Sequence, residues 1–165
     1  MKQGLIYIYT GDGHGKSPAA LGKAVLAAAQ GKNVVILQFL KEKGLADSDF
    51  LQRLEPEIKV FRFEKSALNF FELPEEKQTE EVINIKNGIN FAKKVLSTGG
   101  CDLLILDEVL GLVDNKIISV DDLKGLLDSK DEDTDIIMTG ISLNDEICML
   151  ADEVSRIETL KFKCW

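Results

Sequence analysis

Short runs of apolar residues recur along the chain, and longer charged or helix-forming segments separate them. Residues 5–9 are apolar at every position, and residues 58–63 alternate apolar with charged side chains. Runs of this kind are typical of strands, and an unbroken apolar run indicates a strand that is covered on both faces. The pattern predicts strands over residues 5–9, 34–39, 58–63, 103–106 and 136–138, and a last strand over residues 154–160.

The segments between these runs carry helical signals. Residues 19–29 are rich in alanine and follow Pro18, which suits the first turn of a helix. Residues 74–97 place apolar side chains at helical spacing, with glutamates at the front and lysines at the back. Further helices are expected over residues 47–54, from the capping-box pair Ser119 and Asp122 to residue 127, and from a cap at Ser142 to residue 151. Alternating strands and helices predict an α/β fold with a mostly parallel sheet flanked by helices.

Composition limits the kind of protein. A chain of 165 residues favours one domain with a single sizeable core. The net charge of −8 argues against nucleic-acid binding, which needs a basic surface. The three cysteines lack C-x-x-C spacing, which indicates reduced thiols. No apolar stretch approaches the roughly 20 residues that cross a bilayer, and the first strand begins too early for a signal peptide. We therefore expect a cytoplasmic protein that binds neither nucleic acid nor membrane.

A glycine-rich turn, Thr10-Gly11-Asp12-Gly13-His14-Gly15-Lys16-Ser17, joins the first predicted strand to the first predicted helix. Its glycines let backbone N–H groups converge, and the helix N-terminus adds partial positive charge. Lys16 is placed to neutralise phosphate oxygens, and the Ser17 hydroxyl is placed to ligate Mg²⁺. Thr10 stands where the general motif G-x-x-x-x-G-K-S/T has its first glycine, so the loop is one residue short. The turn predicts a single P-loop nucleotide-binding domain over residues 1–165.

An acidic pair, Asp107 and Glu108, ends the fourth predicted strand. The carboxyl ends of parallel strands meet at one edge of a sheet, so this pair is expected near Lys16 and Ser17. Carboxylates in this position reach Mg²⁺ directly or through water. An Asp-Glu pair after a strand is common by itself, and its combination with the glycine-rich turn predicts a metal–nucleotide site.

Four other residues have two interpretations each. His14, the single histidine, either donates to a phosphate or is a solvated loop residue. Lys41, just after the second predicted strand, either meets a ligand phosphate or is an exposed loop lysine. Phe70 and Phe71 lie in an irregular apolar stretch, where they either stack on a flat ligand or pack under a loop.

Together these motifs resemble the ATP:corrinoid adenosyltransferases of the phosphate-loop class. That family has a short loop close to G-N-G-K-G-K-T-T-A-A, against G-D-G-H-G-K-S-P-A-A at residues 11–20, so the shortened loop is a point of agreement. Gln38-Phe39-Leu40-Lys41 matches a family Q-F-I-K, the strand end at residues 104–108 matches L-D-E, and Thr139-Gly140 matches the start of a late T-G-R. The resemblance spans nearly the whole chain.

The resemblance implies transfer of the 5′-deoxyadenosyl group of ATP to a Co(I) corrinoid, with release of triphosphate, in cobalamin synthesis or salvage. It implies ATP, Mg²⁺ and a corrinoid as ligands, a reductase that supplies Co(I), and a homodimer. Lys16 is the expected catalytic residue, and the expected metal ligands are Ser17, Asp107 and Glu108. The expected ligand-binding residues are Thr10, Gly11, Asp12, Gly13, His14, Gly15, Lys16, Ser17, Lys41, Phe70 and Phe71.

The chain also departs from the family pattern. Ile141 stands where the family has an arginine, and Asp12 and His14 replace asparagine and lysine. The segment around Phe70 and Phe71 lacks the family tryptophan. These departures leave two alternatives open. One is another P-loop ATPase or kinase, and the other is a non-catalytic protein that binds ATP or a corrinoid.

Overall fold

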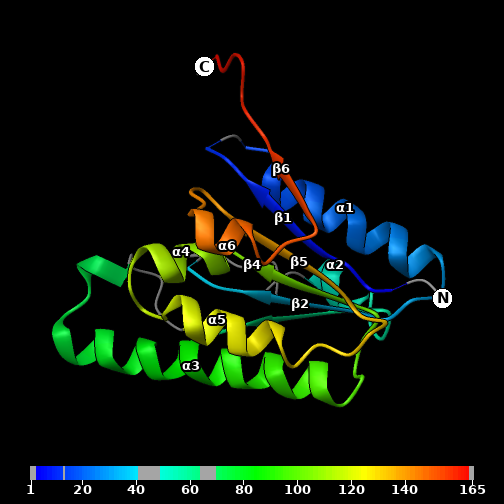
Figure 1. Cartoon of the computed structure of the whole chain (residues 1–165), viewed down its shortest axis with the longest axis horizontal. Coiled ribbons are helices and arrows are strands. Elements are labelled where there is room, and N and C mark those ends of the chain that lie inside the picture. Colours follow the sequence, from blue (N-terminus) through cyan, green and yellow to red (C-terminus); the bar gives the residue numbers. More distant parts are fainter. Residues whose placement is uncertain (1–2, 13, 41–48, 64–69, 164–165) are drawn as a thin grey trace.

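The apolar runs form the strands of one sheet in the computed structural model, which describes residues 3–12, 14–40, 49–63 and 70–163. The strand order is β3-β2-β4-β5-β1-β6, and every neighbouring pair is parallel (Figure 1). This confirms the α/β fold with a parallel sheet. The strands are β1 (Ile6–Thr10), β2 (Val34–Gln38), β3 (Ile58–Arg62), β4 (Leu103–Asp107), β5 (Asp135–Gly140) and β6 (Glu153–Arg156).

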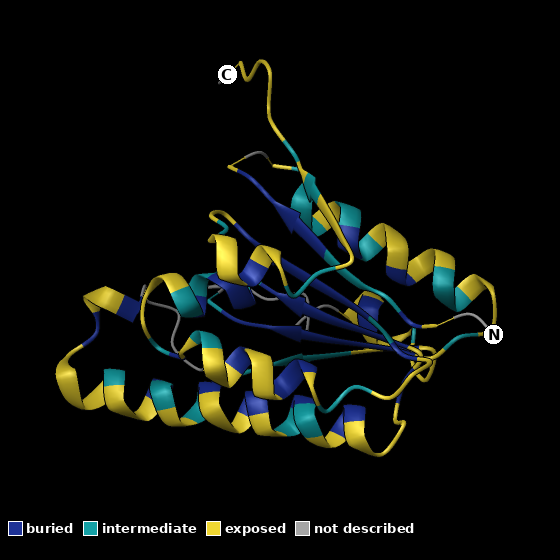
Figure 2. Ribbon diagram, in the orientation of Figure 1, coloured by how far each residue is buried: buried dark blue, intermediate teal, exposed yellow. Residues whose placement is uncertain are grey.

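Helices cover both faces of the sheet, which explains why the strands are apolar on both sides. One apolar core lies between the sheet and α1 (Lys16–Ala29), whose small residues Ala20 and Ala24 are buried. A larger core lies on the opposite face (Figure 2). The elements that form it with the sheet are α3 (Glu75–Ser97), α4 (Val109–Asp114), α5 (Val120–Leu127) and α6 (Asp145–Cys148). Two short elements, α2 (Asp49–Gln52) and the 3₁₀ turn η2 (Phe70–Glu72), complete the described chain.

Most predicted elements are confirmed, including the capping box in which Ser119 and Asp122 exchange hydrogen bonds. Two predictions near the C-terminus are wrong in extent. The last strand ends at Arg156, not at residue 160, and the last helix has four residues. Its cap is Asn144, which accepts the Ile147 N–H at 2.8 Å.

Two further differences concern the predicted cap of α6 and a helix that the sequence did not predict. Ser142 does not cap α6, because its hydroxyl donates to Asp114 Oδ2 at 2.7 Å. Helix α4 was not predicted, and it begins directly after the acidic pair.

Within the described part of the chain, no helix is long and apolar enough to cross a membrane.

Candidate functional site

The strand order brings the two predicted motifs to one edge of the sheet. The glycine-rich turn leaves the end of β1, and the acidic pair leaves the end of β4. Strand β5 lies between them and pairs with both, so its last residues separate the two motifs. Carboxyl ends of parallel strands form the usual ligand-binding edge of such a sheet. The predicted proximity of the motifs is therefore explained by one intervening strand.

Asp107 is the centre of the side-chain contacts at this edge. Asp107 is only 3% exposed, and Oδ1 of its carboxylate accepts a hydrogen bond from the Ser17 hydroxyl at 2.9 Å. The same oxygen accepts a hydrogen bond from the Thr139 hydroxyl at 2.7 Å. Hydrogen bonds to an ionised carboxylate are stronger than neutral ones and hold it in one orientation. Helix α1, strand β4 and strand β5 thus meet at a single carboxylate oxygen.

Glu108 faces Lys16, at the end of the glycine-rich turn. Its backbone has φ of +63°, a left-handed conformation, and its N–H donates to the Thr139 hydroxyl at 2.8 Å. Its side chain forms an ion pair with Lys16, with 3.3 Å between Nζ and Oε1. Only 14% and 17% of the two side chains are exposed, so water screens this pair less than a surface pair. Lys16 therefore has the Glu108 carboxylate as a partly buried ion-pair partner.

The start of the turn is held by hydrogen bonds to one backbone carbonyl. The Thr10 hydroxyl and the Gly11 N–H both donate to the Ile141 carbonyl, at 3.1 and 3.2 Å. Gly11 has φ of +121°, and a Cβ atom there would collide with the backbone carbonyl of Ile157. The position therefore requires glycine for its backbone angle and for this close approach. The Ile141 side chain, at the position of the family arginine, is 60% exposed.

The segment after β6 runs along the glycine-rich turn. The Ile157 N–H donates to the Thr10 carbonyl at 2.8 Å, and the His14 N–H donates to the Thr159 hydroxyl at 3.2 Å. The imidazole of His14 lies against the ring of Phe162, with 4.7 Å between the centroids. These contacts join the turn to residues more than 140 positions later in the chain. A contact between His14 and phosphate stays a prediction.

The residues at this edge fit a magnesium ion in their chemistry. The Ser17 hydroxyl and the Asp107 carboxylate offer the oxygen ligands that Mg²⁺ prefers, and they already lie within hydrogen-bonding distance of each other. Among the residues that the structure describes, no group of three or more His, Cys, Asp or Glu side chains could hold a metal ion. A cation here would thus depend on nucleotide oxygens and water for its other ligands. The Glu108 carboxylate contacts Lys16, and its role toward a metal stays a prediction.

The structure does not bring every predicted residue to this edge. Phe70 is buried and Phe71 is 59% exposed, and their rings meet edge to face with centroids 5.3 Å apart. Their turn, η2, lies beside the start of α3 and well away from the glycine-rich turn (Figure 1). Gly13 and Lys41 lie outside the described residues, and Asp12 is exposed. Binding of a corrinoid by Phe70 and Phe71 therefore stays a prediction.

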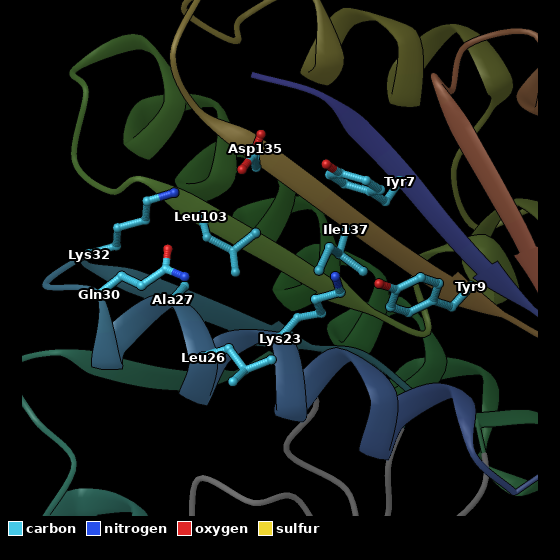
Figure 3. A pocket seen from close by; sticks show the side chains of 10 residues that line it. All are labelled: Tyr7, Tyr9, Lys23, Leu26, Ala27, Gln30, Lys32, Leu103, Asp135 and Ile137. Atoms are coloured by element: carbon cyan, nitrogen blue, oxygen red, sulfur yellow. The ribbon is translucent and has the colours of Figure 1, made fainter. Parts of the chain in front are cut away.

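A separate cavity of about 200 Å³ lies beside the C-terminal half of α1 (Figure 3). Its wall includes Tyr7 and Tyr9 of β1, Lys23 of α1, and Asp135 at the start of β5. Burial raises the pKa of both tyrosines. None of the predicted site residues lines this cavity, so it is distinct from the edge that holds Lys16.

Thr139 is the residue whose place in the site sequence reasoning missed. It is completely buried and contacts both members of the acidic pair. The signal was a polar residue at the end of an apolar strand, the same signal that marked Asp107. The match of Thr139-Gly140 to the family's T-G-R was a second signal, and only the strand order places Thr139 beside Asp107.

Comparisons with known proteins agree with this arrangement. The family model of the ATP:corrinoid adenosyltransferases BtuR/CobO/CobP matches residues 2–164. The chain is 28% identical over 160 residues to the corrinoid adenosyltransferase of Escherichia coli strain K12. The aligned region covers 97% of this chain and 79% of the relative. Corrinoid adenosyltransferase CobA of Salmonella typhimurium strain LT2 has the same identity and coverage.

A solved structure supports the fold. The KaiC-like protein PH0186 from Pyrococcus horikoshii OT3 superimposes with a TM-score of 0.64 at 17% identity, over 99% of this chain and 77% of that one. This likeness confirms a P-loop NTPase-like fold and, at this identity, nothing about activity. Because the family model covers nearly the whole sequence, the chain belongs to the ATP:corrinoid adenosyltransferase family.

Proposed function

We propose that the chain transfers the 5′-deoxyadenosyl group of ATP to a Co(I) corrinoid and releases triphosphate. Membership of the family supports adenosyl transfer to a corrinoid. The observation that carries the proposal is that Lys16 and Ser17, which end a turn of the family's short length, meet the acidic pair of β4 at one edge of the sheet. Ser17 contacts Asp107, and Lys16 contacts Glu108.

The proposed reaction is a displacement at the 5′ carbon of ATP. The lone pair of Co(I) attacks C5′, the Co–C bond forms as the C5′–O bond breaks, and triphosphate leaves with the electron pair of that bond. Co(I) is itself a strong nucleophile, so the protein has no need of a serine or cysteine nucleophile. A reductant, supplied by a partner reductase, has to provide the Co(I) state.

The protein's tasks are therefore orientation and charge stabilisation. Backbone N–H groups of the glycine-rich turn and the Lys16 ammonium would stabilise the negative charge that develops on the leaving triphosphate. Lys16 is available for this if it exchanges Glu108 for phosphate oxygens, because the two side chains are joined by a single ion pair at 3.3 Å. Mg²⁺ bound by Ser17 and Asp107, with Glu108 as a predicted third ligand, would neutralise part of the polyphosphate charge.

The phosphorus product tests the proposal. Incubation with ATP, Mg²⁺ and chemically reduced cobalamin should give a light-sensitive adenosyl product and one triphosphate per turnover, measured by absorbance and by phosphorus NMR. ADP and phosphate as the only products would contradict it and would favour another P-loop ATPase or kinase. Thermal stabilisation by ATP with no product under any reductant would favour a non-catalytic binding protein.

Two lysines of α1 provide a matched pair of variants. Lys16→Ala should lower the turnover rate by about 10²- to 10³-fold, as is typical when one donor to a developing anion is lost. Lys23 is exposed and lies seven residues further along the helix, away from the glycine-rich turn, so Lys23→Ala should stay within about twofold of the wild type. Full activity of Lys16→Ala would remove the loop lysine from the mechanism.

A further inference from the structure

Thr139 occupies the point where three parts of the site meet. It lies near the end of β5, is 0% exposed, and stands between β4 and β1 in the sheet. Its hydroxyl oxygen accepts the Glu108 N–H at 2.8 Å and donates to Asp107 Oδ1 at 2.7 Å. A hydroxyl has one proton, and the amide takes one of its lone pairs, so the proton is directed at the carboxylate. One side chain therefore orients both members of the acidic pair.

The backbone around Thr139 is fixed on both sides. Thr139 pairs with Tyr9 of β1 in the sheet register. The next residue, Gly140, packs so closely against α4 that a Cβ atom there would collide with Cβ of Leu110. The hydroxyl cannot follow a moving carboxylate under these constraints. The Thr139 hydroxyl consequently offers the Asp107 carboxylate a hydrogen-bond donor on a fixed backbone.

We propose that Thr139 is a positioning residue for the metal–nucleotide site. It holds the Asp107 carboxylate toward Ser17, and the Glu108 N–H that it accepts directs its hydroxyl proton at that carboxylate. The affinity for the magnesium–ATP complex then depends on Thr139, although the residue acts through Asp107. This inference rests on the proposed function only in taking ATP and Mg²⁺ as the ligands of this edge.

The hydrogen bonds of Thr139 can be removed with little change of shape. Thr139→Val keeps the branched side chain but can neither accept from Glu108 nor donate to Asp107. Thr139→Ser keeps the hydroxyl and therefore both hydrogen bonds. Residues that orient a metal ligand typically change metal affinity by about 10- to 100-fold when they are replaced.

The experiment compares ATP binding with and without the metal. Isothermal titration calorimetry on the full chain gives the Kd of ATP in EDTA and in excess Mg²⁺. The Kd in EDTA divided by the Kd in Mg²⁺ measures how much the metal tightens binding. Thr139→Val should lower this ratio by about 10-fold or more. Thr139→Ser should stay within about threefold of the wild type, and the Kd in EDTA should change by less than about twofold in both. If Thr139→Val does not fold, Thr139→Ala serves as the variant without a hydroxyl.

A double-mutant cycle separates positioning from general stability. If Thr139 acts through the carboxylate, Thr139→Val should have no further effect on the ratio in an Asp107→Ala background. An equal loss in that background, or an equal loss of ATP affinity in EDTA, would overturn the proposal. So would a wild-type chain whose ATP affinity does not respond to Mg²⁺. A chain that binds magnesium–ATP as described but transfers no adenosyl group would refute the proposed function and leave the role of Thr139 intact.

Discussion

Two glycines in the middle of helices should respond to the same substitution with opposite signs. Gly22 lies in α1 and Gly88 lies in α3. A Cβ atom on Gly22 would meet no described heavy atom within 4 Å. A Cβ atom on Gly88 would lie 2.6 Å from Cγ of Phe63 and 3.0 Å from Cε1 of Phe39. Both rings belong to an aromatic group packed on α3, so neither can turn away freely.

The two free-energy terms can be assigned separately. Replacing glycine by alanine inside a helix favours the folded state by about 1 kcal/mol. Crowding a filled core with an extra methyl group costs about 1–3 kcal/mol. Gly22→Ala should therefore raise the free energy of unfolding by up to about 1 kcal/mol, and Gly88→Ala should lower it by up to about 2 kcal/mol. The gain from replacing a helical glycine is common to both variants. The difference between their free energies of unfolding therefore isolates the cost of crowding at Gly88.

Thermal unfolding followed by circular dichroism measures this difference. For a domain of this size 1 kcal/mol shifts the Tm by about 2–4 °C, so Gly22→Ala should melt above the wild type and Gly88→Ala below it. In a Phe63→Leu background the ring is absent, and Gly88→Ala should lose most of its cost. A rise in Tm for Gly88→Ala as large as that for Gly22→Ala would refute the packing argument.

Three further predictions concern single positions. Gly11→Ala should abolish most of the thermal stabilisation by ATP, because a side chain at φ of +121° would collide with the backbone of the C-terminal segment; an unchanged stabilisation would contradict this. Hydrogen bonds from Ser119 lower the pKa of Asp122 in the folded protein. The stability that this carboxylate provides is therefore complete above its ordinary pKa near 4, and it is lost as the pH falls through the lowered pKa. Denaturant unfolding of Asp122→Asn should show a deficit at pH 7 that disappears in acid. Burial raises the pKa of Cys101 to about 12, so a thiol reagent at pH 8 should modify the exposed Cys148 and spare Cys101 in native protein, as mass spectrometry of peptides would show.

The strands were predictable because burial on both faces leaves a continuous apolar run. Residues 34–39 and 103–106 are such runs, and β2 and β4 match them closely. The capping box at Ser119 was predictable for a local reason as well, since the cap and its partner are three residues apart. Local signals of this kind also located the glycine-rich turn and the acidic pair. They do not depend on the order of the strands.

The remaining features depend on contacts between distant segments. Helix α4 has six residues, too few for a helical period to show, and it starts from a left-handed Glu108 with no capping side chain. Thr139 approaches Asp107 only because β5 lies next to β4, an arrangement that the apolar runs do not encode. The carbonyl of Ile141 holds the glycine-rich turn although the side chain of Ile141 is exposed, and a contact made by a backbone carbonyl leaves no mark on residue type. Distant pairing of this kind explains why the site was predicted in outline and its supporting contacts were not.

The position of β1 has a consequence for how the molecule folds. The first strand of the chain lies between β5 and β6, the last two, and the turn that follows it contacts residues more than 130 positions away. Closing a longer loop costs more conformational entropy, and contacts between residues far apart in the sequence slow folding. The contacts of the N-terminal motif with Ile141, Ile157 and Thr159 can form only when those residues are in place. A nucleotide that binds the folded chain alone would favour this late closure, so the substrate would also act as a folding ligand.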